Sequence, residues 1–139
     1  MANLFYNSFR SNLLDSGAAD AISFPADTIK VVLIDETAYT RSASHQYLSD
    51  VPAPARIGTP QTLAGKTTTA GVFDANDVVF SALVGPTVQS ILIYKDTGVA
   101  ATSPLICLID TVSSGLPTTP TGSDITVVWD SGGNGIFRV

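Results

Sequence analysis

The strongest structural signal in the chain is an apolar segment, Thr28-Ile29-Lys30-Val31-Val32-Leu33-Ile34-Asp35. In a β-strand successive side chains point to opposite faces. The odd-numbered residues of this segment would therefore share one face and the even-numbered residues the other. Both faces are mostly apolar, so we expect a central strand that is covered on both sides.

Further strands are predicted downstream, between turn signals rich in Gly, Pro, Asn and Asp. They are expected at residues 78–84, 88–95, 105–111, 124–130 and 136–139, with an edge strand at 62–69. Turn residues predict one hairpin between the first two of these and a second between the last two. Short strands in this number favour a mainly β fold, a β-sandwich or jelly-roll-like barrel of about 6–8 strands.

The N-terminal segment predicts a short helix over residues 3–15. Phe5, Phe9 and Leu13 recur every four residues, which is the spacing of one helix face. This aromatic stripe either packs on the chain's own sheet or docks on a partner. The candidate docking residues are Phe5, Tyr6 and Phe9.

The composition fits one domain with surfaces that another protein covers. With 139 residues, the chain is predicted to form a single β domain over 1–139, with a helical segment at 1–17 and a β core at 28–139. Hydrophobic residues make up 45% and charged residues only 14%. No apolar run approaches the roughly 20 residues of a membrane span. We expect the excess apolar surface either in the core or under a partner chain, as in an obligate homo-oligomer.

The charge and the cysteine content limit which partners and which cellular compartment the sequence fits. Twelve acidic and seven basic residues give a net charge of −5, which argues against direct binding to a nucleic-acid backbone. The single cysteine, Cys107, excludes a disulfide within the chain. Residues 1–7 lack the basic and apolar regions of a signal peptide. We expect synthesis in a reducing cytoplasm without secretion.

Residues with catalytic or metal-binding chemistry are few. His45 is the only histidine, so any Ser-His-Asp or Cys-His arrangement would have to use it. Asp74, Asn76 and Asp77 could offer oxygen ligands to Ca²⁺, but the spacing also suits a solvated turn. We therefore predict no catalytic residue, no cofactor and no metal.

A specific order and spacing of short segments runs through the chain. Two of these segments are His45-Gln46-Tyr47-Leu48-Ser49-Asp50-Val51-Pro52 and Gly71-Val72-Phe73-Asp74-Ala75-Asn76-Asp77-Val78. Others are residues 28–35, 63–67, 94–98, 103–106, 115–117, 124–130 and 136–139. Together they cover nearly the whole chain, and it resembles a family of small virion structural proteins of tailed bacteriophages. The resemblance carries over no catalytic residue.

The resemblance implies a non-enzymatic virion protein that is assembled in the host cytoplasm. We expect a capsid decoration (cement) protein that binds the major capsid protein on the outer shell. Trimers would suit quasi-threefold positions on such a shell. A tail, neck or fibre component is the structural alternative. A carbohydrate-binding module for host attachment is another, with Trp129 and the four tyrosines as its candidate sugar-stacking residues.

Overall fold

The computed structural model describes residues 3–139; the first two residues of the predicted 1–17 segment lie outside this range. Its strands are β1 (Leu4–Phe5), β2 (Ile29–Ile34), β3 (Arg56–Thr62), β4 (Val72–Phe73), β5 (Val78–Phe80), β6 (Ser90–Lys95), β7 (Leu105–Ile109), β8 (Ile125–Val127) and β9 (Phe137–Arg138). The α-helix is α1 (Asn7–Leu14), and short 3₁₀ turns lie at Leu48–Asp50, Ala53–Ala55, Thr69–Gly71 and Ala100–Thr102. The fold is thus mainly β, as predicted. No helix of the described residues is long and apolar enough to cross a membrane.

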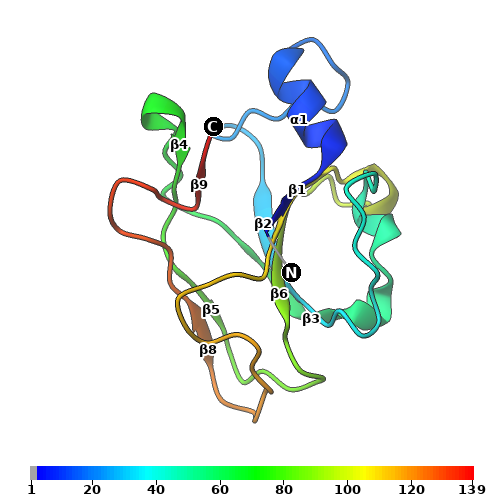
Figure 1. Cartoon of the computed structure of the whole chain (residues 1–139), viewed down its shortest axis with the longest axis vertical. Coiled ribbons are helices and arrows are strands. Elements are labelled where there is room, and N and C mark those ends of the chain that lie inside the picture. Colours follow the sequence, from blue (N-terminus) through cyan, green and yellow to red (C-terminus); the bar gives the residue numbers. More distant parts are fainter. Residues whose placement is uncertain (1–2) are drawn as a thin grey trace.

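An antiparallel sheet with the strand order β1-β7-β6-β2-β3 forms the centre of the molecule (Figure 1). Val31 of β2 lies opposite Ile93 of β6, which in turn lies opposite Cys107 of β7. The predicted central strand is therefore confirmed. Two ribbons, β4–β9 and β5–β8, complete the strand pairs, and no barrel closes among the described strands.

Each face of the five-stranded sheet is covered by different parts of the chain. The first core lies between one face, α1 and the two ribbons, and it contains Val31, Ile93 and Phe80. The second core lies on the opposite face under the segment 35–55, and it contains Val32 and Leu92. The alternation of neighbouring residues between the two cores follows from the two-residue period of a strand.

The N-terminal segment differs from the predicted helix. Residues 4 and 5 form a strand that pairs with β7, with Leu4 opposite Leu108 and Phe5 opposite Cys107. The helix begins only at Asn7. A short isolated helix is only marginally stable. Pairing with the apolar edge strand β7 instead gives the backbone groups of residues 4 and 5 hydrogen-bond partners. Tertiary contacts therefore outweigh the helical spacing of the sequence.

Both predicted hairpins are wrong. β5 pairs with β8, whereas β6 pairs with β2 and β7. β9 pairs with β4, with Phe137 opposite Phe73. The strand predicted at 78–84 ends at Phe80, because the chain turns at Ala82 with a φ of 47° and its N–H donates to Asp124 Oδ1 at 2.8 Å. The predicted edge strand at 62–69 is also misplaced, since the edge strand β3 ends at residue 62.

Candidate functional site

The three aromatic residues predicted to dock on a partner lie largely inside the chain. Tyr6 is fully buried, Phe9 is 3% exposed and Phe5 is partly buried. The ring of Phe5 lies 5.8 Å from that of Phe9 and meets Phe137 edge-on at 5.1 Å, centroid to centroid. Such contacts stabilise a core. Phe5 and Phe9 nonetheless line the same pocket as the exposed residues beside the aromatic stripe.

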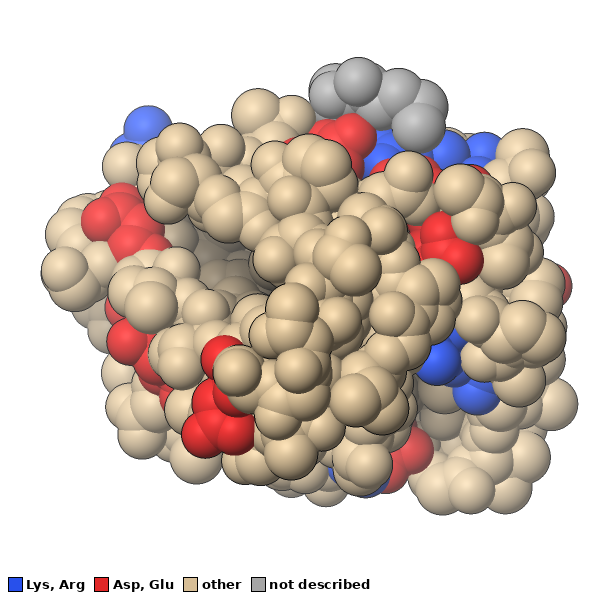
Figure 2. Space-filling model, turned by 90° about the horizontal axis from the view of Figure 1, so that it is seen from below, with Lys and Arg blue, Asp and Glu red and all other residues tan. Residues whose placement is uncertain are grey.

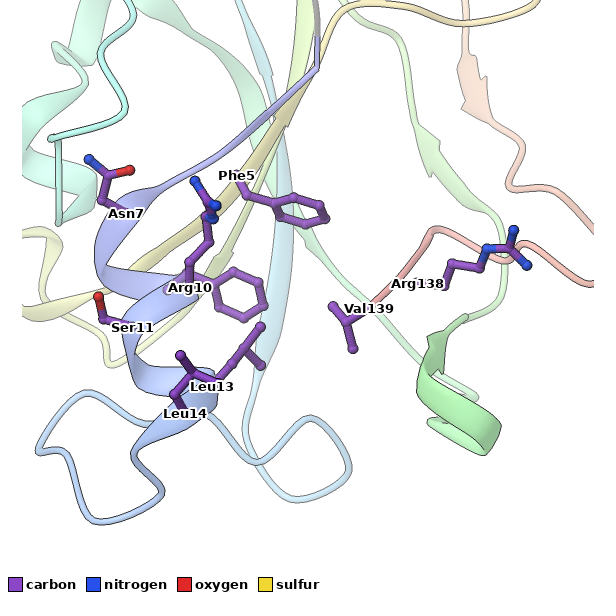
Figure 3. Close-up of a pocket in the computed structure, with 9 residues that line it drawn as sticks. Phe5, Asn7, Arg10, Ser11, Leu13, Leu14, Arg138 and Val139 are labelled. Atoms are coloured by element: carbon purple, nitrogen blue, oxygen red, sulfur yellow. The ribbon is translucent and has the colours of Figure 1, made fainter.

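Those exposed residues form a groove between α1 and the end of β9, which we call the helix groove. It is defined by Leu13, Leu14, Val139, Arg10 and Arg138 and has a volume of about 540 Å³. Leu14 is 92% exposed, Val139 72% and Leu13 45%. Figure 3 shows the two leucines at the last turn of α1, with Val139 on the opposite wall. Large apolar side chains gathered at this exposure mark a surface that another molecule can cover.

The charged side chains that line the helix groove are basic, although the chain as a whole is acidic. Its two charged lining residues, Arg10 and Arg138, are both basic, while the chain carries a net charge of −5. Arg10 lies along the helix near Phe5, and Arg138 extends outward from β9 (Figure 3). Elsewhere, on the face shown in Figure 2, charged residues are scattered over a mostly uncharged surface. The groove thus suits an apolar partner segment that carries carboxylates.

A second hollow, which we call the flank cavity, opens between the β1 edge of the sheet and the segment from β8 to β9. Its volume is about 350 Å³, and its walls include Phe5, Ile91, Cys107, Trp129 and Phe137. Trp129 is held in place because its indole N–H donates to the Asn76 carbonyl at 3.2 Å and its backbone N–H donates to Asp77 Oδ1 at 2.9 Å. The cavity therefore has a fixed aromatic wall.

The second core contains a hydrogen-bonded row of side chains. The Tyr6 and Tyr39 hydroxyls lie 3.0 Å apart, and the Tyr39 hydroxyl lies 2.8 Å from His45 Nδ1. Burial raises the pKa of Tyr6 well above its ordinary value. This row ties the N-terminal strand to the segment that covers the sheet, and it gives His45 a structural partner.

An ion cluster fixes the same covering segment to the sheet. Arg41 Nε donates to Glu36 Oε1 at 2.6 Å, and Arg41 Nη2 donates to Asp110 Oδ2 at 3.1 Å. The three side chains are largely buried, and their hydrogen bonds join opposite charges, which makes such bonds stronger than neutral ones. A carboxylate also stabilises the turn at the end of this segment: Asp50 accepts the backbone N–H groups of Gln46 and Tyr47, which lower the pKa of Asp50.

The structure does not bring the chemistry-bearing residues of the sequence together. Cys107 lies in the first core and His45 contacts the second, on the other face of the sheet. Burial raises the pKa of the Cys107 thiol to about 12, so the thiol is a poor nucleophile. Asp77 accepts the Trp129 N–H and Asp74 accepts the Ala75 N–H. Among the described residues, no group of three or more His, Cys, Asp or Glu is placed to hold a metal ion.

No protein-family model and no curated protein matches this chain. The sequence placed Leu13 on the aromatic stripe, but the exposure of Leu14 and Val139 was not predicted. The exposure of Leu14 follows from the helix period. When Phe9 of this eight-residue helix faces the core, Leu14 lies on the side of the helix that faces solvent.

Proposed function

We propose that this protein is a non-enzymatic structural protein of a tailed-phage virion, and most closely a capsid decoration (cement) protein. The helix groove is the observation that carries the proposal, because it exposes Leu13, Leu14 and Val139 on a folded chain. The resemblance to phage virion proteins and the low content of charged residues, 14%, support it. The partner is the major capsid protein on the outer surface of the head.

Docking through the helix groove would join hydrophobic burial to charge complementarity. Leu14 is the anchor, because its side chain is almost fully exposed in the free chain and loses that exposure on binding. Arg10 lies one helical turn before it and would pair with a carboxylate of the partner. One groove is small beside the roughly 1,200–2,000 Å² of a stable interface. We therefore propose that the protein acts as a homo-oligomer, a trimer, whose several grooves bind together.

The proposed architecture is an open β-sandwich. The five-stranded sheet forms one layer, and the ribbons β4–β9 and β5–β8 form a second, incomplete layer across the first core (Figure 1). Two layers of antiparallel strands facing each other across apolar side chains are the basis of sandwich folds. This arrangement leaves α1 and the helix groove at one end of the molecule, accessible to a shell.

The test is binding of the purified protein to phage heads assembled without it. Wild-type protein should bind at hundreds of copies per head, counted by quantitative mass spectrometry, and cryo-electron microscopy should locate it on the shell. Leu13→Ser with Leu14→Ser should weaken binding at least tenfold. Val99→Ser is the matched control, because Val99 is 57% exposed outside the groove. The proposal fails if the leucine variant binds as well as the control.

Two further outcomes of that experiment identify the alternatives. A handful of copies located at the neck, tail or fibre would replace decoration with the other structural role. A glycan array tests the carbohydrate-binding alternative. Of the aromatic residues proposed to stack on sugars, Tyr6, Tyr39, Tyr94 and Trp129 are buried, which leaves Tyr47 as the partly exposed one.

A further inference from the structure

The flank cavity is lined by both layers of the fold. Ile91 and Cys107 come from the five-stranded sheet, while Trp129 and Phe137 come from the segment that links β8 to the end of the chain. Layers of a sandwich normally fill the space between them with interdigitated side chains. Here a pocket of about 350 Å³, open to solvent on one side, remains between mainly apolar walls. An apolar cavity of roughly 150 Å³ already holds benzene in another protein, so this cavity is large enough for a substituted ring.

The exposed residues of the lining form the mouth of the cavity, and the buried ones form its floor. Asp130 is the one charged residue among the described residues that line it. Asp130 Oδ1 accepts the Gly132 N–H at 2.9 Å, and a carboxylate has further lone pairs for a donor. Asn3 also lies at the mouth, where its Oδ1 accepts the backbone N–H groups of Asp110 and Thr111, each at 2.9 Å. Asp130 therefore gives the mouth a hydrogen-bond acceptor that disfavours anions, whereas the buried floor is mainly apolar.

We propose that the flank cavity binds a small uncharged ligand with one apolar ring and a hydrogen-bond donor at its outer end. The ring would lie between Trp129 and the side chains of the sheet, and the donor would reach the Asp130 carboxylate. Sites of a few hundred Å³ with apolar walls and a few placed polar groups are typical of small-molecule binding. The proposal goes beyond virion docking, because the exposed residues of the helix groove, Leu14 among them, do not line the flank cavity.

Benzyl alcohol, toluene and benzoate are the probes, and ¹H–¹⁵N NMR of the full chain is the measurement. Trp129 is the only tryptophan, so its indole N–H gives a single resonance on the cavity wall. Benzyl alcohol should shift this resonance and the amides of Cys107 and Phe137 in a saturable way. The dissociation constant should be on the order of 1 mM, as efficiency limits for a ligand of this size allow. Benzoate should give no saturable shift, because Asp130 repels its charge.

Two variants separate the floor from the mouth. Cys107→Phe places a ring in the cavity and should weaken benzyl alcohol binding at least tenfold; Ile109→Phe fills it from a partly buried position if the first variant does not fold. Asp130→Ala should weaken benzyl alcohol binding about threefold to tenfold and leave toluene binding unchanged. Leu14→Ser is the control outside the cavity and should bind all probes as the wild type does.

The proposal is overturned if benzyl alcohol gives no saturable shift, or if the shift survives in a folded cavity-filled variant. It is also overturned if Asp130→Ala weakens toluene and benzyl alcohol equally, because the mouth would then select no donor. Failure of Leu14→Ser to bind phage heads would bear on the docking proposal alone and leave the cavity unaffected.

Discussion

The row of hydroxyls in the second core predicts an asymmetry between two isosteric substitutions. Tyr6 is fully buried and Tyr39 is 3% exposed. The Tyr6 hydroxyl has its hydrogen bond to Tyr39, while the Tyr39 hydroxyl also contacts His45. Tyr6→Phe leaves Tyr39 with His45 as a partner, so it should cost only about 1 kcal/mol, the ordinary net value of one hydrogen bond. Tyr39→Phe leaves the buried Tyr6 hydroxyl without that partner and should cost about 2 kcal/mol.

The double variant tests the same reasoning independently of the absolute values. Once Tyr39 is phenylalanine, replacing Tyr6 removes a hydroxyl that has lost its partner, so the second substitution should cost close to nothing. The double variant should then cost about 1 kcal/mol less than the sum of the two single costs. Urea unfolding followed by Trp129 fluorescence measures all four proteins, with the slope m as a check that the denatured state is unchanged. Additive costs, or a larger cost for Tyr6→Phe than for Tyr39→Phe, would refute the reasoning.

Two further predictions concern single positions. Gly135→Ala should destabilise the fold by about 2 kcal/mol or more, because Gly135 has a φ of +55° and an added Cβ would lie 2.6 Å from the Phe73 carbonyl oxygen. Gly98→Ala is the control and should cost about 1 kcal/mol, because Gly98 has a φ of +87° but open space around it. Equal urea midpoints for the two variants would contradict the predicted difference. Asp50 has a lowered pKa in the fold, so its stabilisation is present above the unfolded pKa near 3.9 and is lost as pH falls through the folded value. Asp50→Asn should flatten the stability difference measured between pH 7 and pH 3, and an unchanged difference would count against the assignment.

The long apolar strands could be predicted because their sequences leave little choice. Residues of β2, β6 and β7 are apolar on both faces, and such segments need neighbours on both sides and cover on both faces. Residues 125–127 also show the predicted alternation, with Thr126 exposed and Val127 buried. In these elements the hydrophobic pattern of the sequence and the tertiary environment favour the same structure.

The short ribbons could not be predicted, because their partners lie far away in the chain. Two residues of β4 pair with two of β9 through Phe73 and Phe137, and nothing local distinguishes this pairing from a hairpin. The N-terminal error has a different origin. Phe5, Phe9 and Leu13 are spaced by four residues, which fits the turn of a helix and is also an even number, as a strand requires. Phe5 belongs to the strand and Phe9 to the helix, so one spacing described two elements.

Phe5 also explains why the two candidate surfaces need separate variants. Its ring lines both the helix groove and the flank cavity, and it stacks on Phe9 within the first core. A substitution at Phe5 would change the groove, the cavity and the packing of α1 together, so a loss of binding would identify none of them. Leu14 lines only the groove and Cys107 only the cavity. Function at either surface can therefore be assigned through these two residues while the shared wall stays intact.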